Sequence, residues 1–511
     1  MNRKPEFDRR RILQFGAAAG AVVGTGALVS CGPAADATGS SARAASLLRI
    51  AAADATNSSG LDPRTTSIGA SLIALRHVYD SLMVLKDGRY AYGLAESAEP
   101  NRDATRWTIR LRKNVTFHDG RPVRAADVAY SIKTLATPPS NRASVYADVD
   151  IAAIKVLGEH TVEIPLKRPR GDFKESSLVV FSVVFPDGTK DFAKAIGSGP
   201  YKLGTSDART VRLVANKDYW GTKPAVQTLE ITRIADPTAR LNAVKSGQVD
   251  YAVGIGAASA RAERANQALS IVRSGVANAN GLSFAMNQRL APFDDPQVRR
   301  AVRLCVDREA LVAKSLLGLG TPADDVIGKG LPGYAAGLAP RKRDVAQARR
   351  LFKAAGVSEL TLRTSEIVPG MLSASRLFAQ QLAEAGVKLT LDEVPADSYY
   401  ADLKSLATHP FQAFYYINRP ASVHLATVTH QKAPFNVTGT GKDWWRRLAI
   451  AQTTIDDNAR AKAFAALQQE FYDNGGDVLW GFQEQPDAAR KGIEGVYVNQ
   501  SATMFDRATS S

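Results

Sequence analysis

Residues 344–391 read DVAQARRLFKAAGVSELTLRTSEIVPGMLSASRLFAQQLAEAGVKLTL and contain the elements of a β-α-β unit. Leu360 and Leu362 alternate with polar residues, as in a half-buried strand, and residues 372–385 have the apolar spacing of a helix. Strand alternation returns over 387–391. Two strands that are joined through a helix lie parallel in one sheet. This stretch therefore predicts an α/β fold with a partly parallel sheet.

Elements of both kinds also precede this stretch. Residues 107–112 alternate as a strand, which we expect to continue over 115–117, and residues 125–135 have helical spacing. Asp295-Pro296 predicts a helix start, with the acid as N-cap and proline in the first turn. Cys305 falls on the apolar face of that helix, so we interpret it as a buried core thiol.

Length and charge limit the classes of function. At ~150 residues per domain, the 511 residues suggest about three lobes. The formal net charge is +15, but the basic residues are scattered along the chain, so a nucleic-acid partner is not expected. A carboxylate-bearing ligand or an anionic membrane surface suits this charge better.

The first residues predict export and anchoring. Arg9, Arg10 and Arg11 precede an apolar stretch over 15–29, and Cys31 follows a small residue. This order is typical of a secretory signal, and the stretch is too short to span a bilayer. It resembles a twin-arginine signal joined to a lipobox, with 1–30 as the signal and a lipid on Cys31. The general secretory route, and an ordinary signal with a chance cysteine, are the alternatives.

The composition of residues 31–46 predicts a flexible tether, because they are rich in Ala, Ser and Gly. No later stretch reaches the ~20 apolar residues of a membrane span. We therefore expect a soluble body that is held on the outer face of a membrane by its lipid.

Several motifs together resemble one family, the peptide-binding class (family 5) of extracytoplasmic solute-binding proteins that serve ABC importers. Their order and spacing match over about residues 46–500. The motifs are YDSL (79–82), WTIRLR (107–112), VTFHDG (115–120), ADV (126–128), GSGPY (197–201), NKDYWG (216–221), SGQVD (246–250), FAMN (284–287) and PFDDPQVRRAV (292–302).

The resemblance implies a two-lobed periplasmic-binding-protein fold (type II, peptide-binding class) with an extra subdomain inserted in lobe I. Lobe I would comprise 47–77, 196–277 and 486–511. The inserted subdomain would be 78–195 and lobe II 278–485. The chain would cross between the lobes near 276–287 and 480–489, and the lobes would close on a ligand by a hinge motion.

The resemblance also implies which residues contact the ligand. The loop at Ser67, Ile68 and Gly69 would face an extended ligand with its backbone, as in β-type peptide recognition. On the other lobe, the strand end would contribute ligand contacts from Tyr416, Asn418 and Arg419. Along this strand, successive side chains point to opposite faces, so about half of its aromatic residues are core.

The charge of this second region departs from many peptide binders, which place there an aspartate for the peptide's amino terminus. Residues 403–442 contain no Asp or Glu, but they do contain Arg419. A buried ammonium group would lack a counter-charge here, whereas a ligand carboxylate would be favoured. The alternative for Arg419, or for any other basic residue of this stretch, is that it lies on a solvated face of the protein. His424 and His430 have no spacing typical of a metal site, so no metal or cofactor is expected.

No catalytic motif accompanies these features. The sequence has no Gly-x-Ser-x-Gly elbow, no His-Glu-x-x-His and no phosphate-binding loop, so we do not expect an enzyme. We expect a monomeric lipoprotein that delivers a peptide or peptide-like ligand to membrane permease subunits. The alternatives are a binder of another small solute, such as an opine-like conjugate or a nickel chelate, and a peptide-sensing receptor without uptake.

Overall fold

The computed structural model describes residues 46–54, 61–66, 68–86, 88–403, 405–429 and 435–510. The expected signal, Cys31 and Ser67 lie outside these described residues. Within them, no helix combines the length and the apolar character that a bilayer crossing requires.

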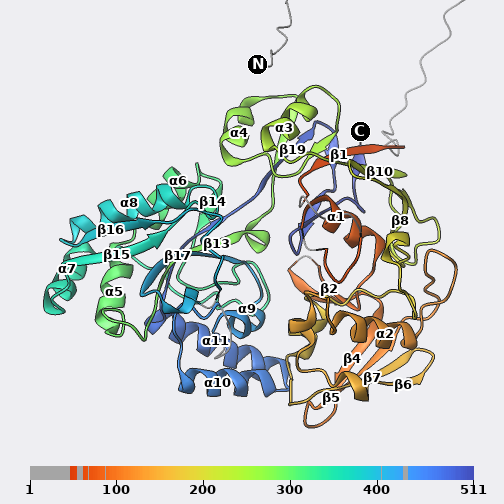
Figure 1. The fold of residues 1–511 in the computed structure, drawn as a ribbon, viewed down its shortest axis with the longest axis horizontal. Coiled ribbons are helices and arrows are strands. Elements are labelled where there is room, and N and C mark those ends of the chain that lie inside the picture. The colour runs from red at the N-terminus through yellow and green to blue at the C-terminus, as the bar shows by residue number, and fades with distance from the viewer. Residues whose placement is uncertain are drawn as a thin grey trace, which may run out of the picture. The chain divides into compact units, whose positions relative to one another are not determined.

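A seven-stranded sheet, together with its helices, forms what we call the first lobe (Figure 1). Its central strand β1 pairs in parallel with β10 and β11, and the other pairs are antiparallel. The helices are α1 (Gly69–Val78), α3 (Pro237–Lys245) and α4 (Ala257–Ala262). The strand order is β12 (Leu269–Arg273), β19 (Pro486–Arg490), β11 (Tyr251–Ala252), β1 (Leu48–Ala52), β10 (Thr228–Arg233), β9 (Thr210–Ala215) and β8 (Tyr201–Ser206).

A smaller four-stranded antiparallel sheet lies between β1 and β8 in the sequence. Its order is β4 (Ala95–Pro100), β5 (Arg106–Leu111), β7 (Thr161–Pro165) and β6 (Lys155–Gly158), and α2 (Ala125–Leu135) packs against it. The hairpin β2 (Met83–Lys86) and β3 (Arg89–Tyr92) precedes it. The helix expected over 125–135 is confirmed.

The expected continuation of strand β5 is wrong. The strand ends at Leu111, and Asn114 has a φ of 62°, which turns the backbone out of the extended conformation. Val115 and Phe117 are nevertheless buried. The apolar alternation therefore reported their burial correctly, and only the backbone geometry was different.

A six-stranded sheet forms the second lobe. Its order is β14 (Gly320–Pro322), β18 (Asp477–Gln483), β13 (Asn280–Met286), β17 (Phe411–Ile417), β15 (Glu359–Thr364) and β16 (Lys388–Glu393). Strands β15 and β16 are parallel and are joined through α8 (Met371–Glu384), which confirms the β-α-β unit.

Two hydrophobic cores cover the two faces of this sheet. On one face, α8 packs with α5 (Pro296–Cys305), α6 (Arg308–Ser315) and α7 (Val345–Ala354). Phe284 of β13 stacks there on Phe378 of α8, with ring centroids 4.5 Å apart. The buried thiol of Cys305 belongs to this core, as expected. Phe414 and Tyr416 belong to the core on the other face, so β17 is buried on both sides.

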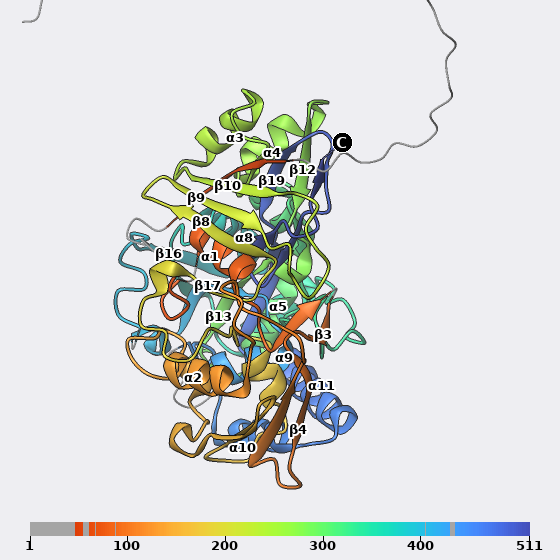
Figure 2. The same cartoon turned by 90° about the vertical axis from the view of Figure 1, so that its right-hand side faces the viewer.

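Three further helices complete the second lobe: α9 (Ala421–Val428), α10 (Lys442–Thr453) and α11 (Asp457–Asn474). Both views place α10 and α11 close to the four-stranded sheet of the first lobe (Figures 1 and 2).

The last strands are short: β20 (Ile493–Glu494), β21 (Tyr497–Asn499), β22 (Ala502–Met504) and β23 (Thr509–Ser510). Of these, β22 packs on α1 of the first lobe.

The chain passes between the two large sheets twice, at 274–279 and at 484–485. These segments overlap the ranges in which the sequence places the crossings. The Ser274 amide donates to the Gln485 carbonyl, and the Gln485 amide donates to Ser274 Oγ. Arg273 also forms an ion pair of 2.6 Å with Glu484. The two crossings are therefore held side by side.

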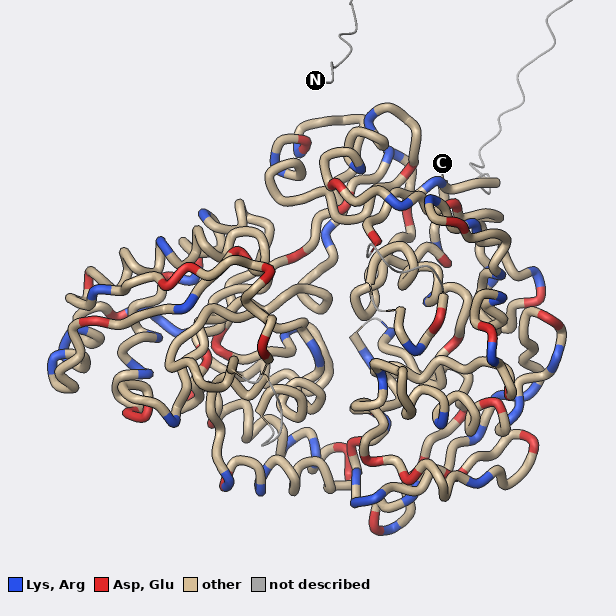
Figure 3. The backbone as a smooth tube through the Cα atoms, in the orientation of Figure 1, with Lys and Arg blue, Asp and Glu red and all other residues tan. Residues whose placement is uncertain are grey.

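Charged residues of both signs are interspersed along the chain rather than gathered in one stretch (Figure 3). Inside the second lobe, however, Asp325 is fully buried and faces three arginines. Its carboxylate lies 2.6 Å from both Arg308 and Arg341, and 3.9 Å from Arg303. Removing one partner of a buried ion cluster leaves the other charges uncompensated.

We therefore predict that Asp325→Ala destabilises the second lobe by about 3–5 kcal/mol, because the buried Arg303 and Arg308 and the partly buried Arg341 lose their shared anion. Urea unfolding followed by tryptophan fluorescence measures the effect. Asp443→Ala is the control, because the exposed Asp443–Arg446 pair should contribute less than ~0.5 kcal/mol. Equal stabilities of the two variants would contradict this view of Asp325.

Candidate functional site

A cleft is formed jointly by the two lobes and by the first crossing segment. It encloses about 980 Å³, including its open mouth. The first lobe contributes residues from α1, from 142–145, from 179–181 and from the C-terminal segment. The second lobe contributes the end of β17 and the start of α9. The wall is largely apolar; its apolar side chains include Leu72, Leu85, Val145, Val179, Val180, Phe181, Leu331, Ile417 and Val423.

Three arginines line this apolar cleft. Arg76 lies in the last turn of α1, Arg142 precedes a short helical turn, and Arg419 follows β17. The guanidinium carbons of Arg76 and Arg142 lie 5.3 and 4.0 Å from the ring centroid of Phe181. The Nε atoms of these two arginines are buried and have no hydrogen-bond partner. The cleft thus contains cationic donors with unused hydrogen-bonding capacity.

The pKa values of these arginines reflect the missing counter-charge. Burial, followed by repulsion from Arg142, lowers the pKa of Arg76 to about 10. Burial also lowers the pKa values of Arg142 and Arg419. All three nevertheless keep their protons at neutral pH. An anion bound between them would raise these pKa values again, because it would stabilise the charged form of each arginine.

Glu175 is the one acidic residue among the described residues that line this cleft. Its Oε1 accepts a hydrogen bond from Arg460 of α11, and the two side chains are almost completely buried. Burial raises the pKa of Glu175, and Arg460 opposes that shift. The charge of Glu175 is therefore balanced by Arg460 and not by the arginines of the cleft.

Asn418 lines the cleft, but its side chain is occupied by backbone groups. Its Oδ1 accepts from the amide of Gly328 at 2.7 Å. Its Nδ2 donates to the carbonyls of Val276 at 2.8 Å and Lys329 at 2.9 Å. The amide therefore joins the end of β17 to the first crossing segment, and its hydrogen bonds to backbone groups give it a structural role.

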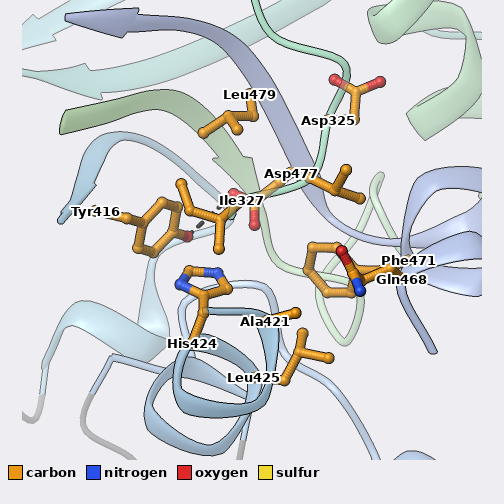
Figure 4. Close-up of a pocket in the computed structure, with 11 residues that line it drawn as sticks. Asp325, Ile327, Tyr416, Ala421, His424, Leu425, Gln468, Phe471, Asp477 and Leu479 are labelled. Carbon is orange, nitrogen blue, oxygen red and sulfur yellow. Dashed lines mark hydrogen bonds between the residues drawn. The ribbon is translucent and has the colours of Figure 1, made fainter. Parts of the chain in front are cut away.

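Tyr416 lies on a small buried cavity next to this cleft rather than on the cleft itself (Figure 4). Its hydroxyl donates to Asp477 at 3.0 Å, and its ring packs edge-on against His424. Burial raises the pKa of Asp477 to about 6. Burial, with the charge of Arg419, lowers the pKa of His424 to about 3, so this imidazole is neutral.

The loop before α1 is also placed away from the cleft. Ile68 is 56% exposed, and neither it nor Gly69 lines the cleft. Gly69 has a φ of 65°, and a Cβ there would lie 2.2 Å from the carbonyl oxygen of Ala53. The glycine is thus required by the close approach of α1 to the end of β1. Of the described residues that we expected at the site, the structure brings Asn418 and Arg419 together in the cleft.

A second hollow of about 1,200 Å³ adjoins the cleft and shares Arg76 and Asn278 with it. Asp80 lines this hollow and accepts hydrogen bonds from Ser198, Tyr219 and Trp220. Burial raises the pKa of Asp80 to about 6. Its present partners are neutral, and they hold Asp80 of the YDSL motif in place.

The lobes also touch at a second place, which we call the latch (residues 168–175 and 452–460). The amide of Gly171 donates to the carbonyl of Gln452 at 2.7 Å. Lys174 pairs with Asp457 at 2.8 Å, next to the Glu175–Arg460 pair. A Cβ on Gly171 would lie only 2.1 Å from the carbonyl oxygen of Thr454. This backbone-to-backbone approach is therefore possible only for glycine.

Sequence reasoning missed Arg76 and Arg142. A signal for Arg76 existed, because it is the one Arg, Lys, Asp or Glu in the helix GASLIALRHV, whose other face is core. Arg142 carried no comparable signal, because it lies in a polar connection. Among the described residues, no group of three His, Cys, Asp or Glu is placed to hold a metal ion.

Two lobes, two adjacent crossings and a cleft between the lobes define the class of two-lobed solute-binding proteins. Comparison with known structures agrees. HbpA2 from Haemophilus parasuis matches with a TM-score of 0.79 at 21% identity, over 91% of this chain and all of that one. NikA from Brucella suis, in complex with Fe(III)-EDTA, matches with a TM-score of 0.78 at 20% identity, over 91% of this chain and 100% of that chain.

Sequence comparison then defines the family. Residues 89–458 match the bacterial extracellular solute-binding proteins, family 5. The glutathione-binding protein GsiB of Salmonella choleraesuis is 27% identical over 367 residues, which cover 70% of this chain and 71% of that protein. The chain belongs to family 5 of the bacterial extracellular solute-binding proteins. These are extracytoplasmic binding proteins of ABC importers and are not enzymes.

We predict that Asn418→Ala lowers stability by about 1–3 kcal/mol, because it leaves a buried amide and two carbonyls without a partner. Chemical unfolding measures the change. Ile417→Ala is the control, because this neighbouring side chain is 42% exposed and should contribute little. An Asn418→Ala protein of unchanged stability that had lost ligand binding would instead assign Asn418 to ligand contact.

Proposed function

We propose that this protein is a lipid-anchored binding protein that captures a peptide or peptide-like solute between its lobes and delivers it to the permease of an ABC importer. The cleft carries the proposal, because its walls come from both lobes and from one crossing segment. A ligand in this position contacts both lobes only when they are closed. Its binding energy therefore favours the closed form.

The latch supports closure as the functional motion. Its contacts join the inserted subdomain to α10 and α11, away from the two crossings. A hinge at the crossings and a contact at the far side would give two defined states, open and closed. The permease would then distinguish the loaded protein by its closed shape.

The relatives support a small peptide-like ligand. Glutathione, named in GsiB, is a tripeptide with two carboxylates, and a solute of this size suits a cleft of about 980 Å³. We propose Arg419 as a ligand contact. The expected roles of Ser67, Ile68, Gly69 and Tyr416 stay predictions, as do the monomeric state and the domain bounds. Mass spectrometry of the small molecules that co-purify with the protein would identify the solute.

Closure is tested with Gly171→Val. We expect solute to reduce the radius of gyration of the wild-type protein in solution scattering, and to leave that of the variant unchanged. The reason is that a side chain at 171 meets backbone atoms of the other lobe, which cannot move aside. Affinity for glutathione, the probe in this test, should fall about tenfold or more, or ~1.4 kcal/mol.

Gly158→Val is the matched control, because it lies in the same subdomain and a Cβ there has open space. It should bind and close like the wild type. Closure of the Gly171→Val protein to the wild-type radius would show that the latch plays no part. Chemical turnover of the bound solute would contradict the proposal as a whole.

Lipid anchoring is tested with Cys31→Ala. We expect the variant to lose palmitate labelling and to leave the membrane fraction, because buried acyl chains supply the anchoring. Equal labelling and equal retention of wild type and variant would refute the anchor. Replacing Arg9 and Arg10 with Lys is a separate test of the export route, and unaffected export would exclude the twin-arginine pathway while leaving lipidation standing.

A further inference from the structure

The arginines of the cleft differ from the other arginines inside the protein. The buried arginines among the described residues each donate to carboxylates or backbone carbonyls. They are Arg170, Arg240, Arg299, Arg303, Arg308 and Arg460. Within the described residues, Arg76 and Arg419 make no side-chain hydrogen bond or ion pair, and Arg142 donates only to the carbonyl of Thr66.

Leaving such groups unpaired is unfavourable. Guanidinium groups in apolar surroundings lose hydration, and an unpaired buried charge is strongly disfavoured. Replacing a buried unpaired charge with an apolar side chain of similar size should therefore stabilise the protein. Arg76, Arg142 and Arg419 are half-buried, and a partner that binds in the cleft would supply the counter-charge that the fold does not.

The geometry of the cleft favours carboxylates as that partner. Arg76 and Arg142 both lie within cation–π distance of the ring of Phe181. The edges of a guanidinium carry its N–H donors, and two of them match the two oxygens of a carboxylate. The apolar wall strengthens each of these hydrogen bonds, because it excludes water.

The charge balance gives the number of carboxylates. Three arginines face the cleft, and the charge of Glu175 is balanced by Arg460. A single carboxylate would leave two like charges facing each other in apolar surroundings. Two or more carboxylates bring the cleft close to neutrality.

Resting on the capture function proposed above, we infer that the cleft selects solutes with at least two carboxylates. Arg76 and Arg142 of the first lobe and Arg419 of the second lobe would hold these groups together. Arg76 and Arg142 repel each other within the first lobe, and Arg419 lines the same cleft from the second lobe. A polycarboxylate would replace this repulsion with attraction, so the charge of the solute would itself drive closure.

The binding test uses the purified mature protein and tripeptides that differ in their number of carboxylates. These are trialanine amide with none, trialanine with one, and Ala-Ala-Glu and glutathione with two each. Titration calorimetry should give dissociation constants for the dicarboxylates about tenfold or more below that of trialanine. Arg76→Met and Arg419→Met should each remove this preference, and Arg419→Lys should retain part of it because it keeps the charge without the fork.

A second readout needs no solute. In thermal unfolding of the unliganded protein, Arg76→Met and Arg419→Met should raise Tm by about 1–3 °C, because each removes an unpaired charge. Arg212→Met, in β9, is the matched control for the loss of one positive charge, because the Arg212 side chain is exposed. It should change neither Tm nor the carboxylate preference.

The outcomes separate the inference from the proposed function. If trialanine amide binds as tightly as Ala-Ala-Glu and glutathione, capture stands and the charge selection is overturned. If Arg76→Met and Arg419→Met lower the Tm of the unliganded protein, these arginines are structural and the inference is likewise overturned. If no tripeptide binds and the radius of gyration never changes, both the inference and the capture of peptides are overturned.

Discussion

One antiparallel ribbon runs through both lobes, and the position of the cleft depends on it. In the first lobe the ribbon is the β12–β19 pair, whose register includes Arg273 opposite Pro486. In the second lobe it is the β13–β18 pair, whose register begins with Asn280 opposite Gln483. Between them, the two strands remain in contact through Ser274, Gln485 and the Arg273–Glu484 pair. The proposed opening and closing of the lobes would therefore take place about this ribbon.

Asn418 connects the binding wall to this ribbon. Its amide joins the end of β17 to Val276 in the first crossing, and Arg419 is the next residue. Any movement of the crossing is therefore transmitted to the position of an arginine in the cleft. The sequence suggested both residues as ligand contacts. In the structure the side chain of Asn418 is hydrogen-bonded within the fold, and Arg419 lines the cleft.

Much of the fold follows from local patterns. The Asp295-Pro296 helix start, the apolar face that buries Cys305 and the β-α-β unit depend on neighbouring residues alone, and each was correct. The alternation expected from Phe411 also corresponds to a strand, β17, which ends at Ile417. Alternation could not tell which face of β17 meets the cleft, however, because both faces are buried. Tyr416 therefore proved to face a small cavity beneath the cleft instead.

The residues that sequence reasoning missed depend on contacts between segments far apart in the chain. Arg76 and Arg142 lie 66 positions apart, and Arg419 lies a further 277 positions along the chain, so only folding shows that the two missed arginines share one cleft with the expected Arg419. Gly171 is a similar case. A side chain at position 171 would meet the backbone of Thr454 in the other lobe, and no local turn reveals this constraint.

The cleft arginines and the latch together suggest how unfavourable charges in the cleft could make closure depend on the solute. In the proposed mechanism, closure without a solute would bury arginines that have no counter-charge, whereas the latch contacts would favour closure. If these two effects are nearly equal, a solute needs to supply only a small difference in free energy to change the population of states. The affinity of the protein and its closure would then have the same physical origin, namely the neutralisation of three arginines by the solute's carboxylates. A neutral solute of the same shape would fill the cleft and leave the repulsion in place.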